Sequence, residues 1–174
     1  MCAMAVLSDV DIKEAMKAEA IKFTPPISTE QLGAGSVDVT LSDEFWRIKI
    51  KEHRTLDLKN ITFEDIFEKI NVKQITIRPG ELVLAKTLEK IRLAPNICGW
   101  IQGRSKFARM GITVHTASSF IQPGSNNHQI LEIVNLSPNP MILHAGMRIC
   151  QIVFEMTEKE TSKPYSKAGT YSKQ

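Results

Sequence analysis

The sequence predicts a mainly β fold, because short runs of alternating apolar and polar residues recur along it and turn-forming residues separate them. A period of two is what a strand with one buried face shows. Pairs such as Pro79-Gly80 and Pro123-Gly124 stand between the runs and favour turns. Many short strands at this spacing are typical of a sandwich or a barrel rather than of a parallel α/β sheet. The runs are SVDVTL (36–41), QITIR (74–78), ELVLAKT (81–87), CGWIQ (98–102), GITVH (111–115), QILEIVN (129–135), PMILH (140–144) and RICQIVFE (148–155).

Two helices are expected where a hydroxyl side chain is followed three residues later by an acid, which is the pattern of a capping box. Ser8 with Asp11 predicts the first helix, close to the N-terminus. Thr62 with Asp65 predicts a second, shorter helix, which continues to Ile70 through apolar residues at helical spacing.

Length and composition indicate a single domain. The chain has 174 residues, of which 43% are hydrophobic and 24% charged, so it can bury a full core without disulfides. Its net charge of +3 comes from scattered lysines and arginines, without the concentrated basic stripe of a nucleic-acid-binding protein. No apolar run reaches the roughly 18 residues of a membrane span, and the first residues lack a secretory signal. We therefore expect a cytoplasmic protein that binds neither nucleic acid nor membrane.

The cysteines and histidines do not indicate a disulfide framework or a zinc site. Three widely spaced cysteines suit a reducing compartment and small core positions. Zinc-dependent nucleoside deaminases need H-x-E followed by P-C-x-x-C, and neither motif is present. The histidines also show no paired ligand spacing. The residues concerned are Cys2, Cys98 and Cys150, and His53, His115, His128 and His144.

The composition changes near residue 155. We expect residues 1–155 to form the β domain and residues 156–174, which contain several lysines and few aliphatic residues, to form a mobile arm. A frayed tail is the simplest interpretation of this segment. Tyr165 and Tyr171 favour another, in which the arm closes over a phosphorylated ligand.

The segment GRSKFARMG, from Gly103 to Gly111, combines an N-cap candidate with several bases. Ser105 is a residue that commonly begins a helix, and free N–H groups at such a start favour phosphate oxygens. Arg104 and Lys106 add positive charge, while Arg109 lies four residues after Ser105, on about the same helix face. A capped helix with surface bases is the alternative. The spacing of a Walker phosphate-binding loop is absent.

Glu132 is a lone acid in the apolar run QILEIVN. With a period of two, Ile130 and Val134 share its face, and Leu131 and Ile133 share the other, so both faces are apolar. A carboxylate in such surroundings tends to pair with a cation or to have a raised pKa. Either state suits a general base that takes a proton from water. An exposed glutamate on an edge strand is the alternative.

These motifs, in this order, resemble the dCTP deaminase and dUTP diphosphatase (dUTPase) superfamily. The resemblance covers GRSKFARMG, then ITVHTASSFIQPG, then ILEIVNLSPNPMILHAGMRICQ, and extends to SVDVTL near the N-terminus and to the PY…TYSKQ ending. It therefore spans most of the chain. The string SSFIQPG is most similar to the archaeal dUTPase branch of the dCTP deaminase family.

The resemblance implies a fold, an assembly and roles for individual residues. The fold is a distorted jelly roll or β-barrel of the dUTPase-like type with short helices, in a homotrimer whose active sites lie at subunit interfaces. Glu132 matches the glutamate that activates water without zinc. Ser105 and Arg109 match residues that assist at the reacting water and substrate, and Arg104 matches a phosphate-binding arginine. The arm residues that match substrate contacts are Tyr165, Tyr171 and Gln174.

The chain departs from the family pattern at three positions. Gln122 replaces the Asp that usually precedes the Pro-Gly turn and holds the sugar 3′-hydroxyl. A Gln amide still hydrogen-bonds a hydroxyl, but it neither takes a proton nor holds a metal ion strongly. Thr170 replaces a lysine of the arm, and Lys106 replaces a common second serine.

Two reactions are compatible with these residues. A dUTP diphosphatase sends water to the α-phosphorus of dUTP, which gives dUMP and pyrophosphate, and Mg²⁺ arrives with the triphosphate. A dCTP deaminase sends water to C4 of dCTP, and some relatives perform both reactions. The resemblance of SSFIQPG favours the diphosphatase, with the deaminase as the alternative. A nucleotide-binding module without catalysis is a third hypothesis, in which Glu132 is structural.

Overall fold

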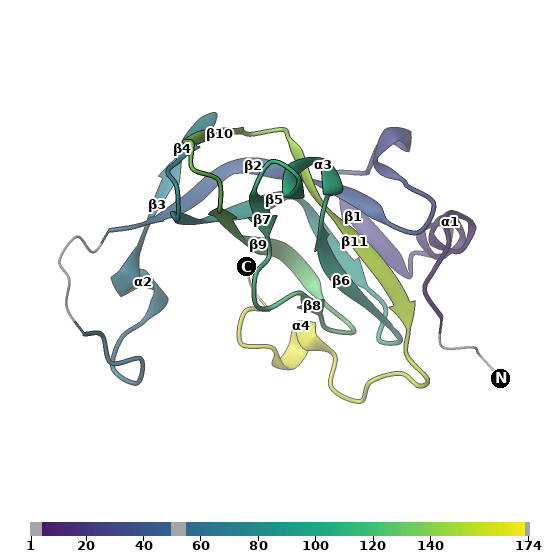
Figure 1. Cartoon of the computed structure of the whole chain (residues 1–174). Coiled ribbons are helices and arrows are strands. Elements are labelled where there is room, and N and C mark those ends of the chain that lie inside the picture. The colour runs from purple at the N-terminus through teal and green to yellow at the C-terminus, as the bar shows by residue number, and fades with distance from the viewer. Residues whose placement is uncertain (1–4, 50–54, 173–174) are drawn as a thin grey trace.

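The computed structural model describes residues 5–49 and 55–172. Cys2, His53 and Gln174, which were singled out in the sequence, lie outside these residues. Antiparallel strands dominate the described part (Figure 1). The mainly β fold with short helices is therefore confirmed.

Within the described residues, the larger sheet has nine strands. Its main order is β7-β9-β5-β2-β11-β6-β8, with β1 also paired to β5 and β3 to β2, while β10 and β4 form a separate pair. The strands are β1 (Ile21–Thr24), β2 (Val37–Ile48), β3 (Phe67–Asn71), β4 (Gln74–Ile77), β5 (Leu82–Leu93), β6 (Ile97–Gly103), β7 (Ile112–Val114), β8 (Phe120–Ile121), β9 (Asn126–Asn135), β10 (Met141–His144) and β11 (Arg148–Met156).

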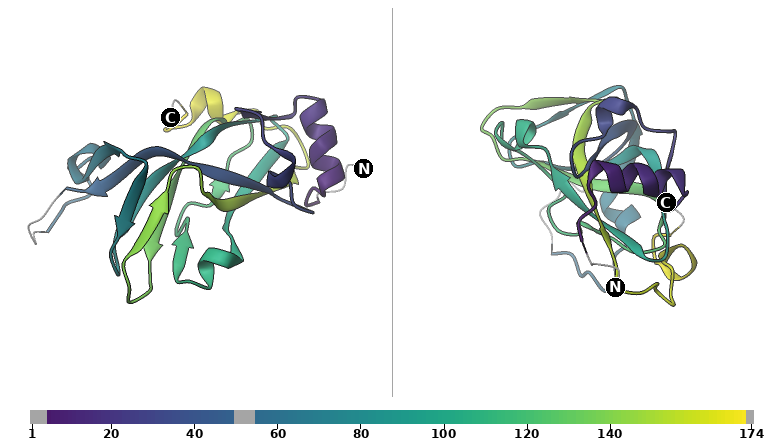
Figure 2. Two further views of the ribbon diagram at one scale, coloured as in Figure 1. Left: turned by 90° about the horizontal axis from the view of Figure 1, so that it is seen from above. Right: turned by 90° about the vertical axis from the view of Figure 1, so that its right-hand side faces the viewer.

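Two long strands bend the larger sheet. The first part of β2 pairs with β11, while its second part pairs with β3 and β5. The β2–β5 register shifts between Leu41 and Phe45, and the β5–β9 register shifts between Lys86 and Lys90. Irregularities of this kind bend a strand and increase its twist. The sheet is consequently curled rather than flat, as the views from two sides show (Figure 2).

The core lies inside this curl and is made of the apolar residues that alternate along the strands. Phe45 and Phe154 are the largest fully buried side chains. Helix α1 (Asp9–Lys17) covers one end of the sheet and buries Ile12 completely. Cys98 and Cys150 are free and buried, so the expectation that they serve as core residues is confirmed for both.

The first helix begins as predicted, and the second is shorter than predicted. Ser8 and Asp11 form the expected capping box of α1, and Thr62 forms one with Asp65 at α2 (Phe63–Ile66). The expected continuation of α2 to Ile70 is wrong, because β3 follows at once and pairs with β2. Tertiary strand pairing thus overrides the local helical spacing. The remaining short helices are η1 (Thr29–Gln31), α3 (Ser105–Ala108) and α4 (Tyr165–Ala168).

Each predicted strand is present, and several extend beyond the predicted run. β2 continues to Ile48 and β5 to Leu93. The short strands β1, β3 and β8 were not predicted: most of β3 was assigned to the second helix, and no strand was assigned to the four residues of β1 or the two of β8. In the described residues no helix is long and apolar enough to cross a membrane.

Candidate active site

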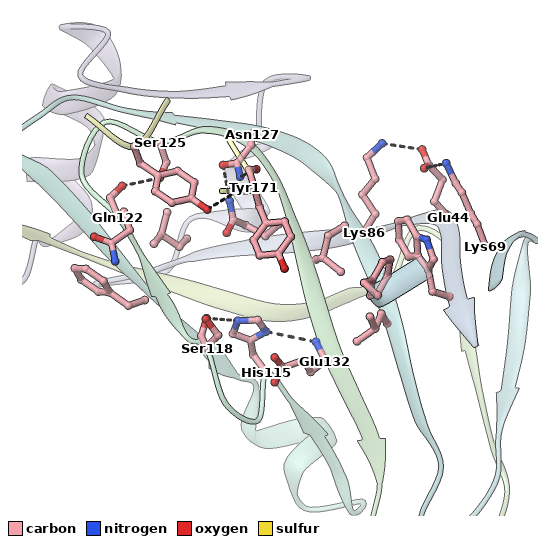
Figure 3. A pocket seen from close by; sticks show the side chains of 18 of the residues that line it. Glu44, Lys69, Lys86, His115, Ser118, Gln122, Ser125, Asn127, Glu132 and Tyr171 are labelled. Carbon is pink, nitrogen blue, oxygen red and sulfur yellow. Dashed lines mark hydrogen bonds and ion pairs between the residues drawn. The ribbon is translucent and has the colours of Figure 1, made fainter. Parts of the chain in front are cut away.

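A cleft of about 720 Å³ opens on one face of the curled sheet. Its lining comes from β2, β3, β5, β9, the segment that joins β7 to β9, helix α2 and the C-terminal segment. Figure 3 shows that these side chains converge although they are far apart in sequence. The lining residues are Glu44, Trp46, Phe63, Glu64, Lys69, Leu84, Lys86, His115, Ser118, Phe120, Ile121, Gln122, Ser125, Asn127, Gln129, Ile130, Glu132, Tyr165 and Tyr171.

Strand register sets the floor of the cleft. Glu132 in β9 is directly opposite Leu84 in β5, Leu84 is opposite Trp46 in β2, and Trp46 is opposite Lys69 in β3. Residues that are directly opposite in a sheet share one face. The four side chains therefore form one row across four strands, with the lone acid at one end and an ammonium group at the other.

Glu132 is half-buried inside the sheet rather than exposed at its edge. Strand β9 lies between β7 and β5, so the edge-strand alternative is wrong. The backbone N–H of Ala117 donates to Oε2 of Glu132 at 2.8 Å. Among the described residues no ion pair involves Glu132, so the expected cation partner is not found within the described part of the chain. Glu132 lines the cleft, and no hydrogen bond from these residues reaches its second carboxylate oxygen.

His115 holds the loop that carries Ala117 against Glu132. Its backbone has a positive φ of 64°, a conformation in which histidine is enriched among non-glycine residues. Its N–H donates to the carbonyl of Glu132 at 2.7 Å, and its ring Nδ1 accepts from the Glu132 N–H at 3.4 Å. The opposite ring nitrogen, Nε2, bonds the carbonyl of Ser118. These contacts fit the neutral ring with its proton on Nε2.

The far end of the cleft is charged and aromatic, and two of its lysines share one glutamate. Glu44 accepts from Lys69 at 2.5 Å and from Lys86 at 2.8 Å. These hydrogen bonds lower the pKa of Glu44 below its ordinary value. The Lys69 ammonium also lies 5.6 Å from the ring centroid of Trp46, and Phe63 packs beside the same ring.

Gln122 lies in the predicted turn, at the mouth of the cleft. The carbonyl of Gln122 accepts from the hydroxyl of Ser125 at 2.6 Å and from its N–H at 3.2 Å. Gly124 has a positive φ of 72°, which glycine adopts without strain. The amide of Gln122 is exposed beside the cleft lining, where it can hydrogen-bond a hydroxyl.

The C-terminal segment packs across the turn and contributes two tyrosines to the cleft. The N–H of Tyr165 donates to the carbonyl of Pro123, and that of Ser166 donates to Gly124, both at 3.1 Å. The N–H of Tyr171 donates to the hydroxyl of Tyr165 at 3.3 Å. Figure 1 shows α4 and the segment around it beside the loop that contains β8.

The structure does not place the GRSKFARMG residues in this cleft. They lie at and around α3, at the end of β6. The expectation that Ser105 is an N-cap is wrong: the N-cap position is Arg104, and no side-chain capping bond is found there in the described chain. Arg104 pairs instead with Asp38 at 2.9 Å and donates to the carbonyl of Arg148. Burial raises the pKa of Asp38, and Arg104 partly offsets this.

The other bases of this segment also lie outside the cleft lining. Arg109 is the C-cap residue of α3, and the Lys106 ammonium lies 5.6 Å from the ring of Phe107. Both are exposed. Of the sequence-predicted site residues, the described chain thus brings together Glu132, Gln122, Tyr165 and Tyr171, and separates from them Arg104, Ser105, Lys106 and Arg109.

Several cleft residues were not predicted. The sequence predicted only a strand or loop position for His115 and a strand position for Lys86. It predicted no role for Trp46. Asn127 and Gln129 precede Glu132 in the same strand, and the run of polar residues from Ser125 to Gln129 was a usable signal. For Trp46 and Lys86 no signal was available, because strand register alone brings them into the same cleft as Glu132.

The arrangement can bind a polar ligand with an aromatic part and present one carboxylate to water. The described residues contain no group of three or more His, Cys, Asp or Glu side chains suited to hold a metal ion. Glu44 is already engaged by two ammonium groups. The chemistry that these residues offer directly is proton transfer at Glu132.

A family model described as dCTP deaminase-like matches residues 6–157. The chain is 37% identical over 174 residues to a "dCTP deaminase, dUMP-forming" of Methanosphaera stadtmanae, covering 98% of this chain and 88% of the relative. It is 34% identical over 173 residues to a "dCTP deaminase" of Rhodospirillum rubrum, covering 94% of this chain and 89% of the relative.

Solved structures show the same fold at low sequence identity. The 2′-deoxycytidine 5′-triphosphate deaminase of Agrobacterium tumefaciens superposes with a TM-score of 0.70 at 16% identity, over 88% of this chain and 47% of that one. The chain thus spans about half the length of that protein. A dUTPase of Streptococcus mutans gives a TM-score of 0.50 at 16% identity, over 82% of this chain and 98% of that one. The expected dUTPase-like type of distorted barrel is confirmed.

Proposed function

Because the chain belongs to the dCTP deaminase-like family, we propose that it is an enzyme of pyrimidine deoxynucleotide metabolism that hydrolyses dUTP to dUMP and pyrophosphate. One observation carries this proposal: Glu132 lines the cleft, with one carboxylate oxygen held by the N–H of Ala117 and no hydrogen bond to the other from the described residues. The name of the Methanosphaera relative, which forms dUMP, supports the same product.

In this reaction Glu132 acts on water, which attacks the α-phosphorus. As the new oxygen–phosphorus bond forms, the bond from the α-phosphorus to the bridging oxygen breaks and pyrophosphate leaves. The free oxygen of Glu132 takes the proton of the attacking water. The Ala117 N–H stabilises the carboxylate and fixes its orientation, while His115 keeps the Ala117 loop in place.

Deamination of dCTP is the second candidate, and the names of the relatives favour it. Forming dUMP from dCTP requires two bonds to break: the bond from C4 to the amino nitrogen, and the bond from the α-phosphorus to pyrophosphate. In the first step water attacks C4, Glu132 takes its proton and passes a proton to the departing ammonia. One carboxylate beside one bound nucleotide is chemically sufficient for either step.

Mg²⁺ belongs to this proposal as the ion that the triphosphate carries. Among the protein groups at the cleft, Gln122 offers a neutral amide oxygen and Glu44 is neutralised by Lys69 and Lys86. The phosphate oxygens therefore supply most of the ligands, as is usual for Mg²⁺ on nucleotides. Zinc has no part in the mechanism that we propose.

We further propose that the enzyme is a homotrimer in which an adjoining copy brings its α3 to the cleft. Ser105 and Arg109 lie outside the cleft lining of their own chain, while the cleft lacks a cation beside Glu132 in the described part of that chain. We propose that Arg109 of a neighbouring copy supplies this cation. Ser105 of the same copy then lies at the reacting water, and its Lys106 adds positive charge for the phosphates. The ion pair with Asp38 holds the guanidinium of Arg104 in place. In this proposal Arg104 therefore binds phosphate from a fixed position.

Mixing two inactive variants tests this shared site. Arg109→Ala and Glu132→Gln proteins, unfolded and refolded together, form some sites that combine an intact Arg109 with an intact Glu132 from different chains. Random mixing in a cyclic trimer restores roughly a quarter of the wild-type activity. Refolding each variant alone is the control. No recovery in mixtures whose trimeric mass is confirmed by light scattering would show that each site is built from one chain.

We also propose that residues 156–174 act as an arm over the bound nucleotide. Tyr165 and Tyr171 line the cleft, so their rings are placed to cover the nucleotide, and Gln174 belongs to the same segment. Gln122 then holds the sugar hydroxyl at the mouth of the cleft. A cytoplasmic location fits this role in nucleotide metabolism.

One assay separates the candidate functions. Pure protein is incubated with Mg²⁺ and either dUTP or dCTP, and pyrophosphate, ammonia and dUMP are measured. Pyrophosphate and dUMP from dUTP support the diphosphatase, and additional ammonia and dUMP from dCTP show both reactions. Ammonia from dCTP without pyrophosphate from either nucleotide overturns the diphosphatase. Neither product, with nucleotide binding intact, identifies a binding module.

A further inference from the structure

Two amide side chains connect the cleft floor to the C-terminal segment. Asn127 is 95% buried, with an exposed fraction of 5%, and its Nδ2 donates to the backbone carbonyl of Tyr171 at 3.2 Å. Gln129, two residues along β9, donates from Nε2 to Oδ1 of Asn127, also at 3.2 Å. Figure 3 shows Asn127 beside Tyr171, on the same strand as Glu132.

The Tyr171 carbonyl determines which way the amide of Asn127 faces, because a carbonyl only accepts, and Gln129 donates to the oxygen that remains. If that amide were flipped, its nitrogen would meet the Nε2 donor of Gln129 and its oxygen would meet the Tyr171 carbonyl. Both contacts would be repulsive, so a single orientation satisfies the pair. The backbone of Gln129 is anchored, because its N–H donates to the buried hydroxyl of Thr87 at 2.9 Å.

The segment that Asn127 holds is already folded upon itself. The N–H of Tyr171 donates to the hydroxyl of Tyr165, and the ring of Tyr165 lies where a side chain at Gly169 would be, 2.4 Å from a Cβ built there. Holding the carbonyl of Tyr171 therefore fixes both tyrosines at once. Losing this bond would leave a buried amide without its partner, which is costly.

We propose that Asn127 and Gln129 are positioning residues that seat the C-terminal arm over the nucleotide, a role that rests on the proposed function. Asn127 holds the arm, and Gln129 supports Asn127 by donating to its amide oxygen. Tyr165 and Tyr171 are then already in place when the substrate arrives. Nucleotide binding therefore costs less conformational entropy in the arm.

The test uses trypsin, which cleaves after the exposed Lys167 in α4. Asn127→Asp keeps the shape of the side chain but replaces the donor with an oxygen that repels the Tyr171 carbonyl. Asn126→Asp, with the same charge change at the exposed neighbouring residue, is the matched control. We expect cleavage after Lys167, without nucleotide, to accelerate about five- to tenfold in Asn127→Asp, less in Gln129→Glu, and not in Asn126→Asp.

Kinetics provide the second readout. In Asn127→Asp we expect kcat/KM for dUTP to fall by a similar factor, mainly through KM. Unchanged cleavage after Lys167 overturns the proposal. Equal acceleration at Lys86 and Lys90 in β5 also overturns it, because the whole fold is then loosened. Faster cleavage with unchanged kcat/KM shows that the amide pair holds the arm without serving the reaction. Cleavage is measured without nucleotide, so it tests the arm contact even if dUTP is not hydrolysed.

Discussion

The backbone N–H of Ala117 lies 2.8 Å from Oε2 of Glu132. This bond joins the loop after β7 to the middle of β9, fifteen residues further along the chain. It leaves one side of the carboxylate occupied and the other available to the cleft. Both properties are needed in a group that takes a proton from a water molecule in a fixed position.

Replacing Glu132 with Gln should nearly abolish turnover and leave the fold intact. The amide has nearly the shape of the carboxylate but cannot take a proton, so kcat for dUTP is expected to fall by about 10²- to 10⁴-fold. Steady-state kinetics and thermal unfolding measure the two effects. Glu158→Gln, at an exposed position, is the control. Full activity in Glu132→Gln would remove this residue as the base.

Deleting residues 163–174 should weaken turnover more than stability. The deletion removes Tyr165 and Tyr171 from the cleft lining but leaves the sheet and its core untouched. We expect a large loss in kcat/KM for dUTP and a melting temperature within a few degrees of the full chain, measured by circular dichroism. An unchanged rate would show that the arm has no part in the reaction.

Gly124→Ala should impair both stability and activity, whereas Gly80→Ala should affect stability alone. Both glycines have a positive φ, 72° and 73°, which costs other residues about 1–2 kcal/mol. A Cβ at Gly124 would also lie 2.7 Å from Cβ of Pro164, whereas one at Gly80 meets no described atom within 4 Å. Urea unfolding and kcat/KM for dUTP separate the two effects. Equal activity in the two variants would contradict the steric argument.

His115→Asn should lower kcat while retaining the backbone conformation. Asparagine tolerates the positive φ at this position, but it cannot bridge the Glu132 N–H and the Ser118 carbonyl as the ring does. We expect kcat for dUTP to fall about tenfold, since the Ala117 loop loses its support. His144→Asn, at an exposed position in β10, should leave kcat unchanged. The same loss in both variants would contradict the bridging role.

Glu44→Gln should destabilise the protein at neutral pH and have less effect in acid. Hydrogen bonds from Lys69 and Lys86 lower the pKa of Glu44 below its ordinary value of 4.5. A lowered folded-state pKa contributes stability above pH 4.5 that is lost as the pH falls through the folded pKa. The difference in unfolding free energy between wild type and variant is expected to be about 1 kcal/mol at pH 7 and to shrink below pH 4.5.

Urea unfolding at several pH values measures this difference. Asp43→Asn is the control, because the Asp43–Lys73 pair is much more exposed and should contribute less. A difference between wild type and Glu44→Gln that stays constant from pH 7 to pH 3 would contradict the assigned cause.

The sequence was sufficient for eight of the eleven strands in the described residues, because alternation reports a buried face directly. It also placed Glu132 in a strand and Gln122 in a turn. It failed at β3, where helical spacing continued from α2 but pairing with β2 decided the outcome. The sequence could not predict that Trp46 and Lys86 line the same cleft as Glu132, since this follows from strand registers that include two shifts. The partner of Arg104 was equally hidden, because Asp38 is 66 residues away in the chain.

The close fit of Gly124 to Pro164 has an evolutionary consequence. A larger residue in the turn would be tolerated only if the proline were lost or its segment rebuilt. Homologous sequences should therefore change these two positions together, and their joint variation across species would reveal which relatives keep this packing of the C-terminal segment against the turn.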